Sequence, residues 1–295
     1  MKRITISLLT ATFLCAALSL AIAQESSQEN SGLTPPPKVL LVLREFLKPG
    51  RGGAAHEKAE SAFVQAFSRA KWPTHYFAAT SLTGKPRVLF FVGFDSFESW
   101  EKDNLAQQKN ATLGAALDRA AAADGENLSD SDSAVLVYNE EQSLRAPVDI
   151  AHMRYFEIYV YRVRPGHRPE WDQLVKIVQG GYEKVEGAHW AMFQADYGQE
   201  GTTFVVFIPL KSASESDKGF ADDKQFAANL GEDGLKKLGE LEAASVEFSQ
   251  RNLFQFTPSM SYPREEWIKA DPDFWKPKAS APAAKPKAKT EAPAQ

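Results

Sequence analysis

The sequence is poor in cysteine, and this scarcity excludes several kinds of chemistry. Cys15 is the single cysteine among 295 residues, and it lies in an apolar run near the N-terminus. If that run is removed, the remaining chain can form no disulfide, no thiolate zinc site and no cysteine nucleophile. We therefore expect the folded part to depend on its hydrophobic core, for which the chain is long enough.

An excess of positive charge is also missing, which bears on the partners of the chain. The sequence has 34 Lys and Arg against 38 Asp and Glu, for a net charge of −4. Binding of nucleic acid is therefore not expected, because it depends on cationic side chains that neutralise phosphates.

Familiar catalytic and metal-binding motifs are absent as well. The 5 histidines form no H-x-x-x-H or H-E-x-x-H pattern. There is no G-x-S-x-G nucleophile turn, no phosphate loop and no G-x-G-x-x-G sequence. The sequence thus predicts no metal and no cofactor, and it leaves open whether the protein is an enzyme.

The N-terminal segment 1–23 has the pattern of a signal peptide. Lys2 and Arg3 precede an apolar run that ends at Ala23 in a small-x-small cleavage pattern. Cleavage there predicts a periplasmic or secreted protein with no remaining membrane span. The alternative is an uncleaved anchor, because about 18 apolar residues can cross a bilayer.

Flexible segments are expected on both sides of the folded region. Residues 24–37 read as a linker that ends in three prolines. Residues 263–295 read as a C-terminal extension ending in a disordered tail of Ala, Pro and Lys. The positive charge of this tail suggests contact with the cell envelope, and a simply solvated tail is the alternative.

The middle of the chain repeats one pattern of strands and helices. Apolar strands are predicted at 38–47 and 155–163, and each is followed by a Pro-Gly dipeptide and then by helical spacing. Two further strands follow in each copy, joined near Gly84 in the first and near Gly198 in the second, where the later strand is predicted at 202–210. Glycine suits the positive φ that tight hairpin turns require.

The second part of each copy supports the same pattern. Capping-box sequences at 95–98 and 212–215 predict helix starts, and a last strand closes each copy, at 134–140 and at 252–257. We therefore predict an α+β fold of two tandem ferredoxin-like β-α-β-β-α-β repeats, at 38–147 and 148–262.

Both faces of the first strand in each copy are apolar or aromatic, so both faces should be buried. This favours two sheets that pack face to face, as an internal pseudo-dimer within a monomeric chain. The arrangement resembles the dimeric α/β-barrel superfamily, with its NIPSNAP-like and antibiotic biosynthesis monooxygenase-like families, in tandem over residues 38 to 262. That resemblance implies cofactor-free oxygenases, haem-degrading enzymes, isomerases or proteins of unknown role, and the fold does not choose among them.

Candidate ligand-binding residues are aromatic side chains and histidines that the repeat places at matching positions. A histidine followed by an aromatic residue begins the second strand of each copy, and the second copy is richer in aromatics, which favours it as the ligand-binding half. The alternative is that these are half-exposed histidines and aromatic core residues. His56 and His167, near helix starts, are interpreted as surface residues rather than as haem ligands. The candidate set is His189, Trp190, Tyr155, Tyr159, Phe193, His75 and Tyr76.

The absence of a catalytic motif favours a small-molecule or protein binding module of the cell envelope as the leading function. Its expected ligand is a small apolar or aromatic molecule. The alternative is a cofactor-independent oxygenase or a haem-handling enzyme of the dimeric α/β-barrel type.

Overall fold

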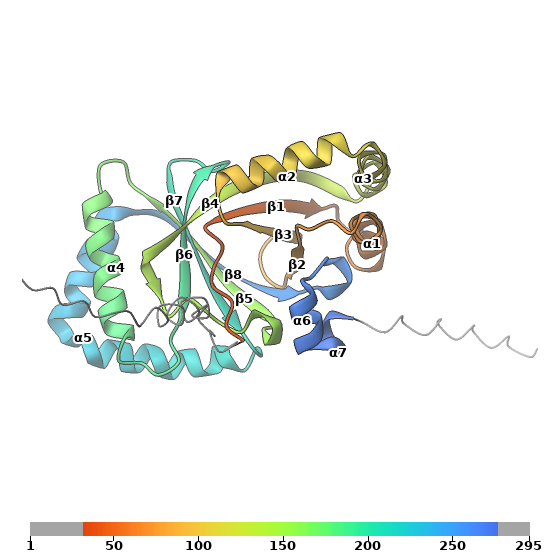
Figure 1. The fold of residues 1–295 in the computed structure, drawn as a ribbon. Helices are drawn as coiled ribbons and strands as arrows, with labels where there is room; N and C mark the ends of the chain where they lie inside the picture. The colour runs from red at the N-terminus through yellow and green to blue at the C-terminus, as the bar shows by residue number, and fades with distance from the viewer. Residues whose placement is uncertain (1–31, 277–295) are drawn as a thin grey trace, which may run out of the picture. The chain divides into compact units, whose positions relative to one another are not determined.

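Eight antiparallel strands close into one barrel in the computed structural model, which describes residues 32–276 (Figure 1). The strands are β1 (Val39–Leu47), β2 (Tyr76–Ser81), β3 (Arg87–Phe94), β4 (Leu128–Leu144), β5 (Tyr155–Val163), β6 (Trp190–Tyr197), β7 (Thr202–Leu210) and β8 (Val246–Phe256). Their order around the barrel is β1-β3-β2-β8-β5-β7-β6-β4. A closed barrel leaves no unpaired sheet edge.

The helices lie outside the barrel, one group over each half (Figure 1). They are α1 (Ala54–Ala70), α2 (Phe97–Lys109), α3 (Ala111–Asp124), α4 (Arg168–Tyr182), α5 (Glu215–Ser245), α6 (Glu265–Ala270) and α7 (Pro272–Trp275). Two short 3₁₀ turns cover Ile150–His152 and Pro258–Met260. The strand and helix order of the first half, β-α-β-β-α-α-β, becomes β-α-β-β-α-β in the second.

The expected face-to-face packing of two sheets is wrong. The strand sets β4-β1-β3-β2 and β8-β5-β7-β6 instead join at their edges, through β2 with β8 and β4 with β6. Edge pairing satisfies the backbone groups of these four strands and gives both halves one shared interior. The predicted repeat boundaries stay a prediction, since the described residues from Thr34 to Lys276 form one compact unit.

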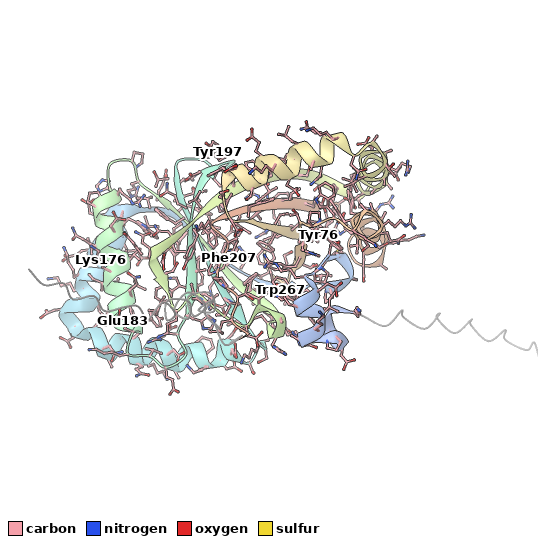
Figure 2. The ribbon with its side chains drawn as sticks, viewed as in Figure 1. Tyr76, Lys176, Glu183, Tyr197, Phe207 and Trp267 are labelled. Carbon is pink, nitrogen blue, oxygen red and sulfur yellow. The ribbon has the colours of Figure 1, made fainter. Side chains whose placement is uncertain are left out.

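Alternation along the strands separates an inner core from an outer layer. In β5, Phe156 and Ile158 belong to the barrel interior, whereas Tyr159 and Tyr161 pack toward α4 and α5. Phe207 lies inside the barrel, and Trp267 of α6 packs against the same interior cluster (Figure 2). Alternate residues of β5 therefore contribute to two different layers, the barrel interior and the outer face that the helices cover.

Two predicted capping boxes do not form as expected. The box of α2 begins at Ser96, one residue later than predicted, with reciprocal 3.1 Å bonds between Ser96 and Ser99. No side-chain cap precedes α5; instead the Glu215 carboxylate accepts a 2.9 Å bond from the backbone N–H of Lys211. The Glu215 side chain thus accepts a hydrogen bond from a backbone N–H that precedes the helix, and it caps no N–H group of the helix itself.

Several predictions concern segments at the chain ends. The signal peptide and the basic tail beyond residue 276 lie outside the described residues. Thr34 of the predicted linker pairs with Val148, and Trp275 of the C-terminal extension is buried. Across residues 32–276, no helix combines the length and the apolar character needed to cross a membrane.

Gly198, in the turn between β6 and β7, is expected to be essential for closing the barrel. Its φ is +76°, and a Cβ there would lie 2.1 Å from the backbone oxygen of Ser133 on β4. Gly187 has nearly the same φ, +77°, but a Cβ added there would meet no atom within 4 Å. Gly198→Ala should therefore lower the free energy of unfolding by about 1–3 kcal/mol more than Gly187→Ala, measured by urea denaturation. Equal losses would contradict this role.

Candidate functional site

An aromatic cavity lies in the second half, between the outer face of the sheet and helices α4 and α5. Its volume is about 440 Å³, which falls in the usual range of roughly 300–1,000 Å³ for small-molecule sites. We call it the aromatic pocket. Its aromatic wall is formed by Tyr159, Tyr161, Trp171, Tyr182, Trp190 and Phe220.

The strand period and the helix spacing together build the flat wall of this pocket. Tyr159 and Tyr161 are two residues apart on β5, so they share one face, and their rings lie 6.1 Å apart at only 6°. Trp171 on α4 stacks on Phe204 of β7 at 4.9 Å. Because the rings are held by packing, the pocket offers preformed apolar surfaces to a planar guest.

An ion pair between a buried carboxylate and an exposed guanidinium supplies the polar end of the pocket. Glu157, two residues before Tyr159, is 8% exposed, and its Oε2 lies 2.7 Å from Nη2 of Arg251. Its Oε1 accepts a 3.1 Å bond from the hydroxyl of Ser216 on α5. Arg251 pairs with Tyr159 in the sheet register, and its guanidinium lies 5.1 Å from that ring. These contacts compensate for burying the carboxylate.

The tyrosines of the pocket are held in their neutral form. Burial raises the pKa of Tyr161 to about 12. Burial also raises the pKa of Tyr159, and burial together with Asp223 raises that of Tyr182. Tyr182 donates a 2.6 Å hydrogen bond to Asp223. The phenols therefore serve as neutral hydrogen-bonding groups at neutral pH.

Three of the predicted ligand-binding residues line this pocket: His189, Trp190 and Tyr159. The ring nitrogens of His189 face the backbone oxygens of Gly187 and Pro209, at 2.8 and 2.9 Å. Trp190 donates from Nε1 to the backbone oxygen of Gln142 at 2.8 Å. His189 and Trp190 thus anchor the end of the pocket and have no ring nitrogen free for proton transfer.

The other predicted residues lie elsewhere. Phe193 and His75 line a separate barrel-interior cavity of about 220 Å³, where His75 stacks on Tyr262 at 4.6 Å. Tyr76 borders both this cavity and one of about 270 Å³ under the helices of the first half. Tyr155 shares the outer face of β5 but lies at the strand end, outside the aromatic pocket lining. The sequence-based set therefore does not form one site.

Arg251 and Tyr182 are pocket residues that the sequence-based set omits. The sequence predicts that strand β8 begins at 252, which leaves Arg251 outside the sheet, whereas the strand begins at Val246. Tyr182 enters the sequence prediction only as part of the apolar helical spacing, which α4 confirms. Arg251 could be recognised only from its pairing with Tyr159 of β5. That pairing joins residues far apart in the sequence, so no local pattern predicts it.

The aromatic pocket does not fit a haem, which the haem-handling alternative requires. Its histidine, His189, already faces two carbonyl oxygens, so neither nitrogen is available as an axial ligand. Burial favours protonated phenols at Tyr159, Tyr161 and Tyr182, whereas a tyrosine ligand to iron binds as the phenolate. His56, predicted to lie on the surface, is in fact 1% exposed and lies among carboxylates in the first half.

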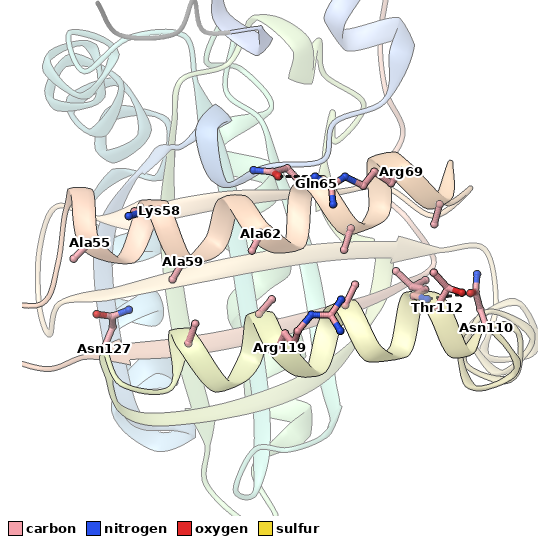
Figure 3. A pocket seen from close by; sticks show the side chains of 16 residues that line it. Ala55, Lys58, Ala59, Ala62, Gln65, Arg69, Asn110, Thr112, Arg119 and Asn127 are labelled. Atoms are coloured by element: carbon pink, nitrogen blue, oxygen red, sulfur yellow. Dashed lines mark hydrogen bonds between the residues drawn. The ribbon is translucent and has the colours of Figure 1, made fainter. Parts of the chain in front are cut away.

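A larger hollow follows the seam between α1 and α3 (Figure 3). Its volume is about 730 Å³, and small side chains such as Ala55, Ala59 and Ala62 form much of its wall. Arg69 and Arg119 border it. Small residues allow the two helices to approach closely, so this seam is explained by helix packing and we assign no ligand to it.

No protein-family model and no curated protein matches the sequence. Similar solved structures include an anthrone oxidase-like protein, with TM-score 0.49, 17% identity and coverage of 77% of this chain and 95% of that chain. A candidate monooxygenase from Fusobacterium nucleatum subsp. nucleatum has TM-score 0.48 and 12% identity. The match covers 76% of this chain and 94% of that chain. A chlorite dismutase variant from Candidatus Nitrospira defluvii has TM-score 0.44 and 8% identity, and covers 79% and 95%.

These neighbours correct the leading functional prediction. They are named as an oxidase-like protein, a candidate monooxygenase and a chlorite dismutase, and none of the three is a binding module of the cell envelope. These names contradict the predicted binding module and agree better with the alternative, while the likeness itself is one of fold. The neighbours are dimeric α/β-barrel proteins, and this chain has an α+β fold with an eight-stranded barrel.

Proposed function

We propose that this chain is an oxygenase that acts on a planar aromatic substrate in the aromatic pocket and needs no bound cofactor for that step. The observation that carries the proposal is the buried carboxylate of Glu157, paired with Arg251 at the edge of an aromatic cavity of about 440 Å³. A pocket for apolar guests alone would have no need of a buried charge, because such burial is costly.

The shape and chemistry of the pocket favour one class of substrate. The near-parallel rings of Tyr159 and Tyr161 suit a flat, fused or conjugated ring system. The charged end suits a carbonyl or phenol oxygen within reach of Arg251. We therefore propose a planar aromatic compound with an acidic C–H bond next to a carbonyl group.

The step assigned to the pocket begins with proton transfer. The Glu157 carboxylate takes the proton from the acidic C–H, and the electron pair of that bond moves into the ring system as an enolate. Arg251 donates hydrogen bonds to the enolate oxygen and stabilises its charge. The enolate carbon then bonds to dioxygen, and the returned proton completes a hydroperoxide. The carbon loses two electrons and dioxygen gains them, so no further reductant is required.

The pocket aromatics protect this chemistry from water. Trp171 is 1% exposed, and neutral tyrosines complete the wall. The apolar wall keeps water from the inner side of the pocket and shields the reactive enolate from premature reprotonation, whereas Arg251 at the edge stays open to solvent. The helix α5 residue Ser216 holds the second Glu157 oxygen, so the carboxylate keeps its orientation.

We also propose that the two halves form an internal pseudo-dimer. The matching strand orders β4-β1-β3-β2 and β8-β5-β7-β6 support this reading. Of the two cavities between the sheet and the helices, the one in the second half is larger, at about 440 against 270 Å³. The proposal therefore assigns substrate binding to the second half.

Oxygen consumption tests the proposed function. The purified chain should consume dissolved oxygen when supplied with polycyclic phenols or anthrone-like ketones that have an acidic C–H, at a rate proportional to enzyme concentration. The same compounds should quench the fluorescence of the pocket residues Trp171 and Trp190. Planar analogues without an acidic C–H should quench but consume no oxygen. Quenching without consumption by every acidic compound would contradict the oxygenase step, and no quenching would contradict the pocket assignment.

A further inference from the structure

A second cluster of polar side chains is buried under the helices of the first half. Glu45 comes from β1, His56 and Glu60 lie one turn apart on α1, and Asp124 is the last residue of α3. One ligand atom from each residue lies within 4.8 Å of the others. Helices α1 and α3 run side by side (Figure 3), so the cluster joins three elements.

The burial of this cluster is nearly complete. His56 is 1% exposed, Glu60 3% and Asp124 2%. Charged residues are rarely buried to this degree unless they are paired or bind a metal. The Nε2 atom of His56 lies 3.0 Å from Oε2 of Glu45 and 3.4 Å from Oδ1 of Asp124, so a single imidazole faces two carboxylates.

The cluster lacks the positive charge that its carboxylates require. Oε1 of Glu60 and Oδ1 of Asp124 are buried and make no hydrogen bond. Between residues 32 and 276, His56 is the only basic side chain within 4.0 Å of these carboxylates. Two buried carboxylates and the partly buried Glu45 against one imidazole are unfavourable unless protons or a cation balance them.

We propose that Glu45, His56, Glu60 and Asp124 bind a divalent first-row transition-metal ion. Imidazole together with carboxylates suits Zn²⁺, Mn²⁺ or Fe²⁺, whereas Mg²⁺ and Ca²⁺ prefer oxygen ligands alone. Atoms that bind one ion at about 2.0–2.2 Å lie at most about 4.4 Å apart. The 4.8 Å limit of this cluster therefore needs an adjustment of only a few tenths of an ångström.

The cluster also has a side on which water can complete the coordination. Glu45 and Glu60 line the cavity of about 270 Å³ under the first-half helices. The buried hydroxyl of Tyr76 borders the same cavity and makes no hydrogen bond. The sequence predicts no metal because the familiar zinc patterns require two histidines on one helix. A histidine and a glutamate one turn apart place their side chains on one face in the same way.

Metal titration of the full chain tests the proposal. The chain is stripped with a chelator and then titrated with Zn²⁺, or with Co²⁺ as a spectroscopic probe. About one ion should bind per chain, with d–d absorption for Co²⁺ and a higher melting temperature for Zn²⁺. Mg²⁺ at the same concentration should produce neither effect. A wild-type chain that binds neither Zn²⁺ nor Co²⁺ would overturn the proposal.

Variants locate the ion and separate ligation from a structural role. Glu60→Gln should weaken Zn²⁺ binding at least about tenfold, while the metal-free variant melts at the same or a higher temperature than the metal-free wild type, because one buried carboxylate charge is gone. Glu57→Gln, an exposed neighbour on α1, should bind Zn²⁺ as the wild type does. Unchanged affinity in Glu60→Gln would place the ion elsewhere and refute the assignment. These readouts are independent of oxygen consumption, so this proposal and the oxygenase proposal can fail separately.

Discussion

Glu157→Gln is expected to lower kcat for oxygen consumption by about 10²–10⁴-fold, the usual effect of removing a general base. Glutamine has nearly the same shape, and its amide oxygen can keep the hydrogen bond from Arg251 while its NH2 group donates to the rotatable hydroxyl of Ser216. Substrate binding should therefore change little, and the loss should appear in kcat rather than in the quenching constant. Steady-state oxygen uptake combined with fluorescence titration measures both quantities.

Asp222→Asn is the matched control for this prediction. Asp222 also lines the aromatic pocket, but its carboxylate pairs with Lys218 at 2.7 Å. The substitution removes one negative charge from the same pocket and leaves the Glu157–Arg251 pair intact, so kcat should change by less than about threefold, as expected when a charge acts only at a distance through solvent. Similar losses in both variants would show that pocket charge, and not a base at position 157, supports the reaction.

The stability of Glu157→Gln separates the catalytic loss from misfolding. Arg251 loses its anionic partner, yet its side chain is 55% exposed, so water can solvate the guanidinium. The melting temperature should therefore stay close to that of the wild type. A low kcat together with a strongly reduced melting temperature would be a folding defect and would give no support to the base.

Local patterns in the sequence predict several elements at the right place. Strands β5 and β7 occupy the ranges expected for them, 155–163 and 202–210. Both strands are apolar on two faces and are bounded by glycine or proline, so neighbouring residues determine their limits. The helical spacing of Trp171, Leu174 and Val175 likewise marks the buried face of α4.

Contacts between distant parts of the chain are beyond such patterns. Closure of the barrel depends on Ala79 of β2 pairing with Phe256 of β8, and no local signal specifies that register. From the sequence, two apolar strand faces therefore suggest two sheets packed against each other. In the structure, one face of each such strand lines the barrel interior and the opposite face packs against helices. The same limit applies to His56, which is buried because Glu45 and Asp124 approach it from β1 and α3.

The candidate site illustrates both outcomes. Tyr159 follows from the aromatic alternation along one strand, and the structure places it in the aromatic pocket. Phe193 joins it in the sequence-based set as an aromatic residue, but the strand period places Phe193 inside the barrel. The pocket residue Arg251 lies on β8, opposite Tyr159, and only the folded register brings it to Glu157. The sequence can therefore predict that aromatic residues on this strand contribute to a site. It cannot predict which distant residues form the ion pair beside them.

Phe207→Ala should lower the free energy of unfolding by about 3–5 kcal/mol, as is usual for truncating a buried phenylalanine. Phe207 is 5% exposed at the centre of the barrel (Figure 2). Its ring lies 5.5–5.7 Å from those of Phe91, Phe156 and Phe193, which come from both halves. Alanine would remove all three contacts and enlarge the neighbouring interior cavity of about 220 Å³. Urea denaturation monitored by circular dichroism measures the loss.

Phe248→Ala provides the comparison for this core substitution. Phe248 lies on β8 and is 42% exposed, so its truncation should change the unfolding free energy by no more than about 1 kcal/mol. Because Phe207 contacts rings from both halves, its truncation should also preserve a single cooperative transition while shifting it to lower urea. Separate unfolding of the two halves in Phe207→Ala, or a loss no greater than that of Phe248→Ala, would contradict a shared barrel core. The shared core is what distinguishes the closed barrel from two independently stable sheets, since only in the barrel does one phenylalanine stabilise strands of both halves.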